Sequence, residues 1–237
     1  MSVYAVRALP CAACGAVRPV RVVQSANPTR HPQFIDELLD RTFNRFRCPA
    51  CGAVEAIDGP MLWTDVSADL VALMAEPSQR WGWRELEVQV ARSFDGPVRH
   101  EGPQFVQAWG RGVAIRLVFG LEELREKVVA RRHRLRDTTI EVLKLPYGDL
   151  ADGRAPVLES VDDDGIHFAR PPAALVVADA PSPGERLVAV VPWRVYERRL
   201  ERSELDAVEF PGLFAGTWVH WSRAPVPPLE APVGRPA

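Results

Sequence analysis

The sequence predicts an α+β protein, because strand-like and helix-like segments are interspersed along its 237 residues. Three observations lead to this prediction. Short stretches alternate apolar and polar residues, which indicates strands. Longer stretches repeat apolar residues every three or four positions, which indicates amphipathic helices. All the cysteines lie in the first 51 residues, which indicates a distinct N-terminal module followed by a mixed α/β C-terminal part.

The first segment, residues 1–77, is predicted to be mainly β. Alternation predicts strands over residues 3–9 and 17–24. Phe34, Leu38 and Phe43 recur at helical spacing, so a helix is expected over residues 32–42. Two more strands are expected within residues 61–76, around a turn at 65–69, before Pro77 ends them.

The second segment, residues 78–145, is predicted to be a helical and strand extension of the first. A helix is expected over residues 83–94, because its periodic pattern stops at the breaker Asp95-Gly96-Pro97. A strand over 113–119 precedes two further helices, over 121–132 and 137–145. Asp137 favours the start of the last helix, where an acidic side chain interacts well with the helix dipole.

The third segment, residues 146–223, is predicted to be a mixed C-terminal region of unknown type. Strands at 157–161 and 166–170 flank an Asp-Asp-Asp-Gly turn, which predicts a hairpin. Further expected elements are strands over 175–178, 187–191 and 217–221 and a helix over 193–200. Residues 224–237 are rich in proline and small residues, so a disordered tail is expected there.

The strongest chemical signal is a matched pair of Cys-x-x-Cys-Gly motifs, at residues 11–15 and 48–52. Each motif places two sulfurs on one side of a tight turn, and the glycine permits the positive φ at which the turn ends. Backbone N–H groups can then point at the sulfurs and stabilise thiolate charge. Two such turns supply four ligands and leave no coordination position for water. We therefore expect one structural, non-catalytic zinc ion in a zinc-ribbon-like module, bound by Cys11, Cys14, Cys48 and Cys51.

Other interpretations of the cysteines fit the sequence less well. The gap between the pairs is longer than the roughly 15–20 residues of common zinc ribbons, and the helix over 32–42 fills the difference. A thioredoxin-type redox site needs one pair at the start of a helix, whereas extended segments follow both pairs here. Unconnected buried cysteines would not occur as two matched motifs. His31 is a conceivable substitute ligand, but a solvated loop residue beside Pro32 is the expectation.

At these cysteines the sequence resembles the CpXC domain family, which is named for paired Cys-Pro-x-Cys motifs. The second motif matches fully, whereas Ala12 stands where the family has proline in the first. That proline binds no metal, so its replacement leaves ligation intact. The resemblance continues through residues 24–46, 60–77, 119–127 and 140–144, and so covers about residues 3–145. It implies zinc ligation and a fold, but no activity, because the family is functionally uncharacterised.

The composition and net charge of the chain bear on its expected cellular location and on the classes of partner it is expected to bind. The formal net charge is −2, which excludes a strong overall attraction to nucleic acid or an anionic membrane. The N-terminus lacks a basic region followed by an apolar one, and no apolar run reaches about 18 residues. We therefore expect a cytoplasmic protein without a membrane partner, where thiols stay reduced. The many Arg, Ala and Pro residues suggest a GC-rich bacterial genome.

No catalytic motif is recognisable, including nucleotide-binding loops, the zinc-protease motif and the hydrolase serine motif. The expected function is therefore a non-enzymatic scaffold or adaptor that presents a surface to another protein. A basic run at residues 125–136 provides the alternative, a nucleic-acid-binding or transcription-associated zinc ribbon. Glu122, Glu123 and Glu126 lie in or beside this run and favour a solvated helix face instead. An enzyme of unrecognised type ranks third.

Overall fold

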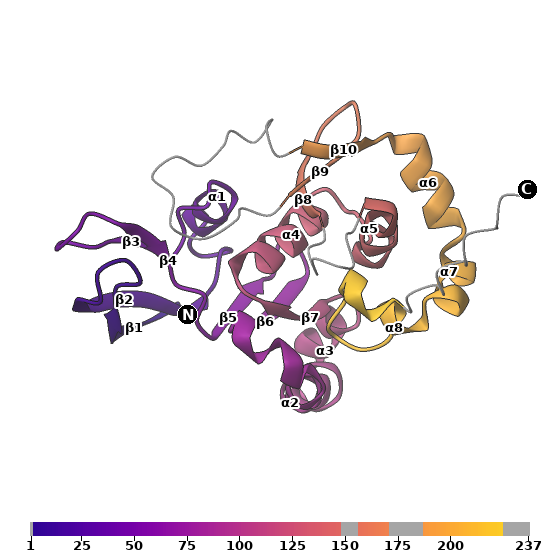
Figure 1. The fold of residues 1–237 in the computed structure, drawn as a ribbon. Helices are drawn as coiled ribbons and strands as arrows, with labels where there is room; N and C mark the ends of the chain where they lie inside the picture. The colour runs from indigo at the N-terminus through magenta and orange to yellow at the C-terminus, as the bar shows by residue number, and fades with distance from the viewer. Residues whose placement is uncertain (1, 148–155, 171–186, 225–237) are drawn as a thin grey trace, which may run out of the picture.

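The computed structural model describes residues 2–147, 156–170 and 187–224, and it has the α+β architecture expected from the sequence (Figure 1). Its largest sheet has five strands in the order β1-β2-β5-β6-β7. The strands are β1 (Val3–Pro10), β2 (Val17–Ala26), β5 (Met61–Asp65), β6 (Leu70–Ala75) and β7 (Ala114–Phe119).

The pairing in this sheet is mixed. The pairs β1–β2 and β5–β6 are antiparallel, and β6 runs parallel to β7 from Leu70↔Ala114 to Ala75↔Phe119. A short parallel contact, Ser25↔Leu62 and Ala26↔Trp63, joins β2 to β5. The sheet therefore combines strands from residues 1–77 with a strand from residues 78–145.

Helices cover both faces of the sheet, because apolar side chains alternate along its inner strands. On one face lie α1 (Gln33–Leu39) and α4 (Leu121–Arg132), around buried Phe34, Trp63 and Leu124. On the other face, α2 (Trp83–Phe94) and Trp218 pack on β6 and β7. Strand β6 serves both cores, with Leu70, Ala72 and Met74 on the first face and Val71 and Ala75 on the second.

A second, smaller sheet lies on the far side of α4, as Figure 1 shows. Its order is β10-β9-β8, with β8 (Val157–Val161), β9 (Ile166–Ala169) and β10 (Leu187–Val191) all antiparallel. Together with α5 (Asp137–Lys144) and α6 (Trp193–Glu201) it encloses a third core, which includes Ile140, Phe168 and Tyr196. Helix α4 is thus packed from opposite sides, and most of its residues are buried.

The remaining elements are short. The hairpin β3 (Arg45–Arg47) and β4 (Val54–Ala56) carries the second cysteine pair. Helix α2 is preceded by a 3-10 helix (Pro77–Gly82) and followed by a π-helical segment (Asp95–Glu101) and α3 (Gln104–Gly110). Helix α6 is followed by α7 (Ser203–Glu209) and α8 (Pro211–Phe214). A 3-10 turn at Leu145–Tyr147 follows α5, and another at Trp221–Arg223 lies near the end of the described residues.

Most of the predicted elements are present, but the strand expected over residues 217–221 is wrong. One backbone bond joins Thr217 to β7, from Leu117 N–H to Thr217 O at 3.1 Å. The carboxylate of Glu87 accepts the N–H groups of both Thr217 and Trp218, at 2.6 and 2.9 Å. These amides are therefore unavailable to a strand partner, and the chain turns at Trp221 instead.

Two other expectations concern residues that the structure does not describe, namely the strand at 175–178 and, apart from Ala224, the tail at 224–237. Within the described part of the chain, every helix is too short or too polar to cross a lipid bilayer.

Candidate metal centre

Each cysteine pair lies in the turn of a β-hairpin. In the β1–β2 hairpin, Cys11 N–H donates to Ala16 O at 3.0 Å and Gly15 N–H donates to Cys11 O at 2.8 Å. The β3–β4 hairpin repeats this pattern, with Cys48 N–H to Ala53 O at 2.7 Å and Gly52 N–H to Cys48 O at 2.8 Å. Both glycines have positive φ, +72° and +76°, as the motif requires. The two turns are therefore the same local structure, formed twice.

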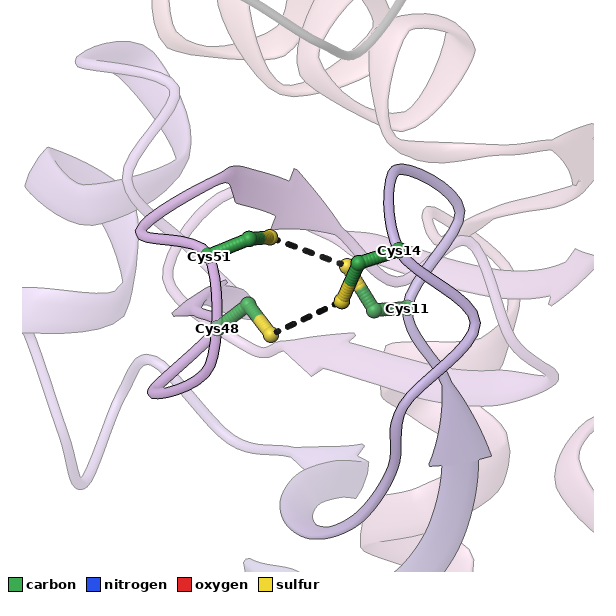
Figure 2. Close-up of side chains that lie close together, drawn as sticks. All are labelled: Cys11, Cys14, Cys48 and Cys51. Carbon is green, nitrogen blue, oxygen red and sulfur yellow. Dashed lines mark hydrogen bonds between the residues drawn. The ribbon is translucent and has the colours of Figure 1, made fainter.

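The two turns face each other, so that all four sulfurs converge (Figure 2). The Sγ atoms of Cys11 and Cys51 are 3.7 Å apart, and those of Cys14 and Cys48 are 3.8 Å apart. All four ligand atoms lie within 4.8 Å of one another. A tetrahedral site with metal–sulfur bonds of about 2.3 Å has edges of about 3.8 Å. The sulfur positions fit a single metal ion, and the four thiols are not joined as disulfides.

Backbone amides provide part of the electrostatic environment of the sulfurs. The N–H groups of Cys51 and Ala50 point at the Cys48 sulfur and lower the pKa of its thiol to about 6. The thiolate is the form that binds a metal, so this turn prepares Cys48 for ligation. Cys11 and Cys48 are buried, whereas Cys14 and Cys51 reach the surface.

Sequence reasoning missed a buried ion pair beside the cluster, formed by Arg18 and Glu55. Arg18 Nη2 donates to Glu55 Oε2 at 2.9 Å, and Glu55 Oε1 accepts from Ala12 N–H at 2.7 Å and from Cys11 Sγ at 3.0 Å. The guanidinium lowers the pKa of Glu55 to about 2, whereas the hydrogen bond to Glu55 raises the pKa of Cys11 to about 12. The pair therefore joins the first turn to strand β4, which follows the second.

A sequence signal for this pair does exist, although it is visible only once the two hairpins are aligned. Arg18 lies four positions after Cys14, and Glu55 lies four positions after Cys51. Equivalent positions of the two matched hairpins thus carry opposite charges, and convergence of the hairpins brings those charges together.

The other sequence candidates lie elsewhere. The ring of His31 packs on Phe34, with centroids 5.3 Å apart, and this residue is not part of the cysteine group. Within the described residues, those four cysteines are the only His, Cys, Asp or Glu group close enough to hold a metal. Strands β2 and β4 follow the two pairs, so the helix that a thioredoxin-type site needs is absent from both positions.

The basic run at residues 125–136 is not a single solvated helix face. Arg125 is buried and donates to Leu39 O, Leu158 O and Glu159 O, at 3.2, 3.3 and 2.9 Å. Lys127 is buried too, between Glu141 and Val219 O, both 2.8 Å from its Nζ. The exposed cations of the run lie at and just beyond the C-terminal end of α4, because the second sheet and α5 cover the middle of the helix.

A comparison with known protein families gives a match. A family model described as CpXC protein matches residues 9–144, which is more than half of the chain and includes all four cysteines. No curated protein matches the sequence, and no solved structure matches it.

Proposed function

The chain belongs to the CpXC family, and on that premise we propose that it is a non-enzymatic adaptor whose N-terminal module is stabilised by one structural zinc ion. The observation that carries the proposal is the convergence of four sulfurs at tetrahedral spacing. Four thiolates favour zinc among the common divalent ions of the cell. They also fill its coordination sphere, which leaves no position for a reacting water.

The metal part of this proposal is tested by elemental analysis of purified protein. We expect one zinc per chain, and loss of that zinc in Cys48→Ser, because three remaining thiolates leave the site open. Ser67→Ala, a hydroxyl removed from the exposed turn between β5 and β6 and outside the cysteine group, is the control and should keep its zinc. A preparation without zinc, or one that carries iron in its place, would contradict the proposal.

The adaptor part rests on apolar side chains that α6 and α7 present to solvent. Leu205 and Val208 lie one helical turn apart on α7 and are 60% and 81% exposed. Val195 and Leu200 on α6 are exposed as well. Exposed apolar side chains one helical turn apart, as on α7, are typical of surfaces that another protein covers.

Capture from a nuclease-treated lysate of the source organism, followed by direct binding between purified components, tests this part. We expect a protein that binds at fixed stoichiometry, and Leu205→Asp with Val208→Asp should weaken that binding at least about tenfold. The matched control is Trp81→Asp with Phe105→Asp, two exposed apolar residues on the 3-10 helix before α2 and on α3. Equal loss in both double variants would contradict an interface on α6 and α7.

A nucleic-acid-binding protein is the second candidate, supported by the exposed Arg132, Arg134 and Arg136 around the end of α4. Burial of Arg125 and Lys127 removes two of the cations on which this candidate depends. Filter binding of DNA and RNA at two salt concentrations separates the candidates. Submicromolar affinity that falls steeply with salt, in the absence of a protein partner, would replace the adaptor proposal with this one.

A further inference from the structure

A polar cleft of about 610 Å³ lies beside the C-terminal end of α4. Its walls are the turn between β5 and β6, one residue of α1, and three arginines at the end of α4. The lining residues are Ile35, Asp65, Ser67, Ala68, Asp69, Arg131, Arg132 and Arg134. Small-molecule sites commonly measure about 300–1,000 Å³, but most are lined by apolar side chains. A cleft of this size with a charged lining suits a small charged ligand.

The first arginine fixes the shape of the cleft. Arg131 donates from Nε to Ala68 O at 3.1 Å and from Nη2 to Asp69 O at 2.9 Å. It thereby ties the end of α4 to the β5–β6 turn. The position of its guanidinium group is set before any ligand arrives, so no conformational entropy is lost there on binding.

The two acidic residues of the cleft already accept hydrogen bonds from the protein. Asp65 Oδ1 accepts from the Ser67 hydroxyl at 2.6 Å and from the N–H groups of Ser67 and Ala68 at 3.1 and 3.2 Å. Asp69 Oδ1 accepts from Trp109 Nε1 at 3.0 Å. These carboxylates hold the turn, and neither forms an ion pair with Arg132 or Arg134 in the described part of the chain.

The other two arginines carry charges that no described residue pairs with. Arg132 and Arg134 are exposed, and their guanidinium groups have no hydrogen-bond or ion-pair partner among the described residues. Most other arginines that line the protein's interior or its element junctions are paired, as Arg18, Arg41 and Arg116 are. A planar guanidinium can donate two parallel bonds to a phosphate, and two free ones on the same cleft provide such donors.

Arg134 also occupies a backbone position that usually favours glycine. Helix α4 ends in a Schellman motif, with Arg134 N–H bonded to Arg131 O at 3.0 Å and Leu135 N–H bonded to Ala130 O at 2.8 Å. The residue between these bonds must be left-handed, and Arg134 has φ of +55°. A side chain at this position strains the backbone, so the sequence retains an arginine where glycine would be more stable.

We propose that this cleft binds the phosphoryl group of a small phosphorylated ligand, with Arg132 and Arg134 as its hydrogen-bond donors. Arg131 keeps the end of α4 joined to the β5–β6 turn. The C-terminal end of α4 carries partial negative charge and cannot itself attract an anion. The attraction therefore has to come from the side chains. This site is independent of the adaptor surface on α6 and α7 and of the metal centre.

Inorganic pyrophosphate is the probe, titrated into the zinc-loaded full-length protein by calorimetry at two salt concentrations. We expect saturable binding that weakens with salt, and about tenfold weaker binding in Arg132→Gln with Arg134→Gln. Arg194→Gln with Arg198→Gln, two exposed arginines of α6, is the matched control and should bind like the unmodified protein. Arg131 is left unchanged because it holds the turn.

Arg134→Gly separates ligand binding from folding. Glycine relieves the left-handed strain, so Tm should rise by about 2–4 °C while pyrophosphate binding weakens. No saturable binding, or equal losses in the control pair, would overturn the proposal. A single-stranded oligonucleotide that binds more tightly with length and that pyrophosphate fails to displace would overturn it in favour of a nucleic-acid surface.

Discussion

His220 is a buried histidine in the segment between α8 and the 3-10 turn Trp221–Arg223. Its ring stacks on Trp218 with centroids 5.3 Å apart, Nδ1 lies 2.8 Å from the Ser222 hydroxyl, and Nε2 lies 3.6 Å from Glu123 Oε1. Burial lowers its pKa to about 4, despite the opposing attraction of Glu123 and Glu141 and with help from Arg80 and Lys144. The folded protein therefore keeps this ring neutral at pH values where the unfolded chain protonates it.

The free energy of unfolding should consequently fall between about pH 6.5 and pH 4. The unfolded state binds a proton below about pH 6.5 and the folded state does not, so protons favour unfolding across this window. The contribution of His220 reaches about 3 kcal/mol at the lower end. Urea unfolding at several pH values, with and without His220→Gln, measures it.

The difference between the two proteins is the relevant quantity, because other groups titrate in the same range. Glu126 is buried and its pKa is raised to about 7, which favours the folded state as the pH falls and so opposes the effect of His220. Subtracting the two pH profiles cancels this contribution. Profiles that stay parallel from pH 7 to pH 4 would show that His220 is protonated equally in both states.

Among the elements, α4 is unusual because charged side chains occupy its buried middle. Glu126 and Lys127 lie between the two sheets, with Glu141 and Lys144 of α5 opposite them. Lys127 Nζ is 2.8 Å from Glu141 Oε1, and Lys144 Nζ is 2.5 Å from Glu126 Oε2 and 3.1 Å from Glu141 Oε2. The two lysines thus face two acidic side chains inside the molecule, which compensate their charge as burial requires.

Removing one charge from this set should cost more than removing a pair. Lys127→Met removes a positive charge beside the Glu141 carboxylate and the hydrogen-bond donor of Val219 O. We therefore expect the free energy of unfolding to fall by about 3–5 kcal/mol. Lys127→Met with Glu141→Leu restores neutrality and should be less destabilised than the single variant. Denaturant unfolding of the single and double variants provides the test, and additive losses would contradict the coupling.

The elements that sequence predicts well are those whose local pattern matches their environment. Helices α2 and α4 have the bounds expected, because their flanking signals, Asp95-Gly96-Pro97 and Gly120, act locally. The burial of α4 was not predictable in the same way. Its acidic and basic residues are typical of a solvated helix, and only the tertiary partners on α5 and β8 explain how they are accommodated inside.

Contacts between residues far apart in the sequence explain the remaining differences between the prediction and the structure. The segment 217–221 has the composition of a strand, but one carboxylate from α2, Glu87, takes the amides that a strand would pair. The grouping of the four cysteines was predictable, because the spacing within the two matched motifs is itself typical of a metal site. Arg18 and Glu55 were not, since their contact exists only after two separate hairpins have met.

At the scale of the whole molecule, the candidate metal centre lies apart from the three apolar cores. None of the four cysteines belongs to the three apolar cores of the described residues, and two residue pairs alone join β2 to β5. The β3–β4 hairpin buries little apolar surface of its own, and the β1–β2 hairpin contributes only Val23 and Ala26 to the first core. A structural zinc ion in such a module typically supplies on the order of 10 kcal/mol of apparent binding energy.

Chelation should therefore unfold the N-terminal hairpins and leave most of the rest intact. In hydrogen exchange followed by mass spectrometry, we expect amides near residues 11–16 and 48–53 to lose protection first. Peptides from β6, β7 and α4 should keep theirs, since their cores contain no ligand. Cys48→Ser should reproduce this pattern without chelator. Simultaneous loss of protection throughout the chain would show that the sheet cannot survive without the metal.

The duplication of the cysteine turn has a consequence for how the site assembles. Each turn presents two sulfurs in the same local geometry. A turn from another molecule can therefore complete the coordination of a metal ion that is held by one turn. Residues 16–47, which form β2, α1 and β3, connect the two turns within one chain and hold them at a high effective concentration, on the order of millimolar. Metal uptake should accordingly be independent of protein concentration in dilute solution, and cross-linking of chains through shared ions should begin only when the protein itself approaches that concentration.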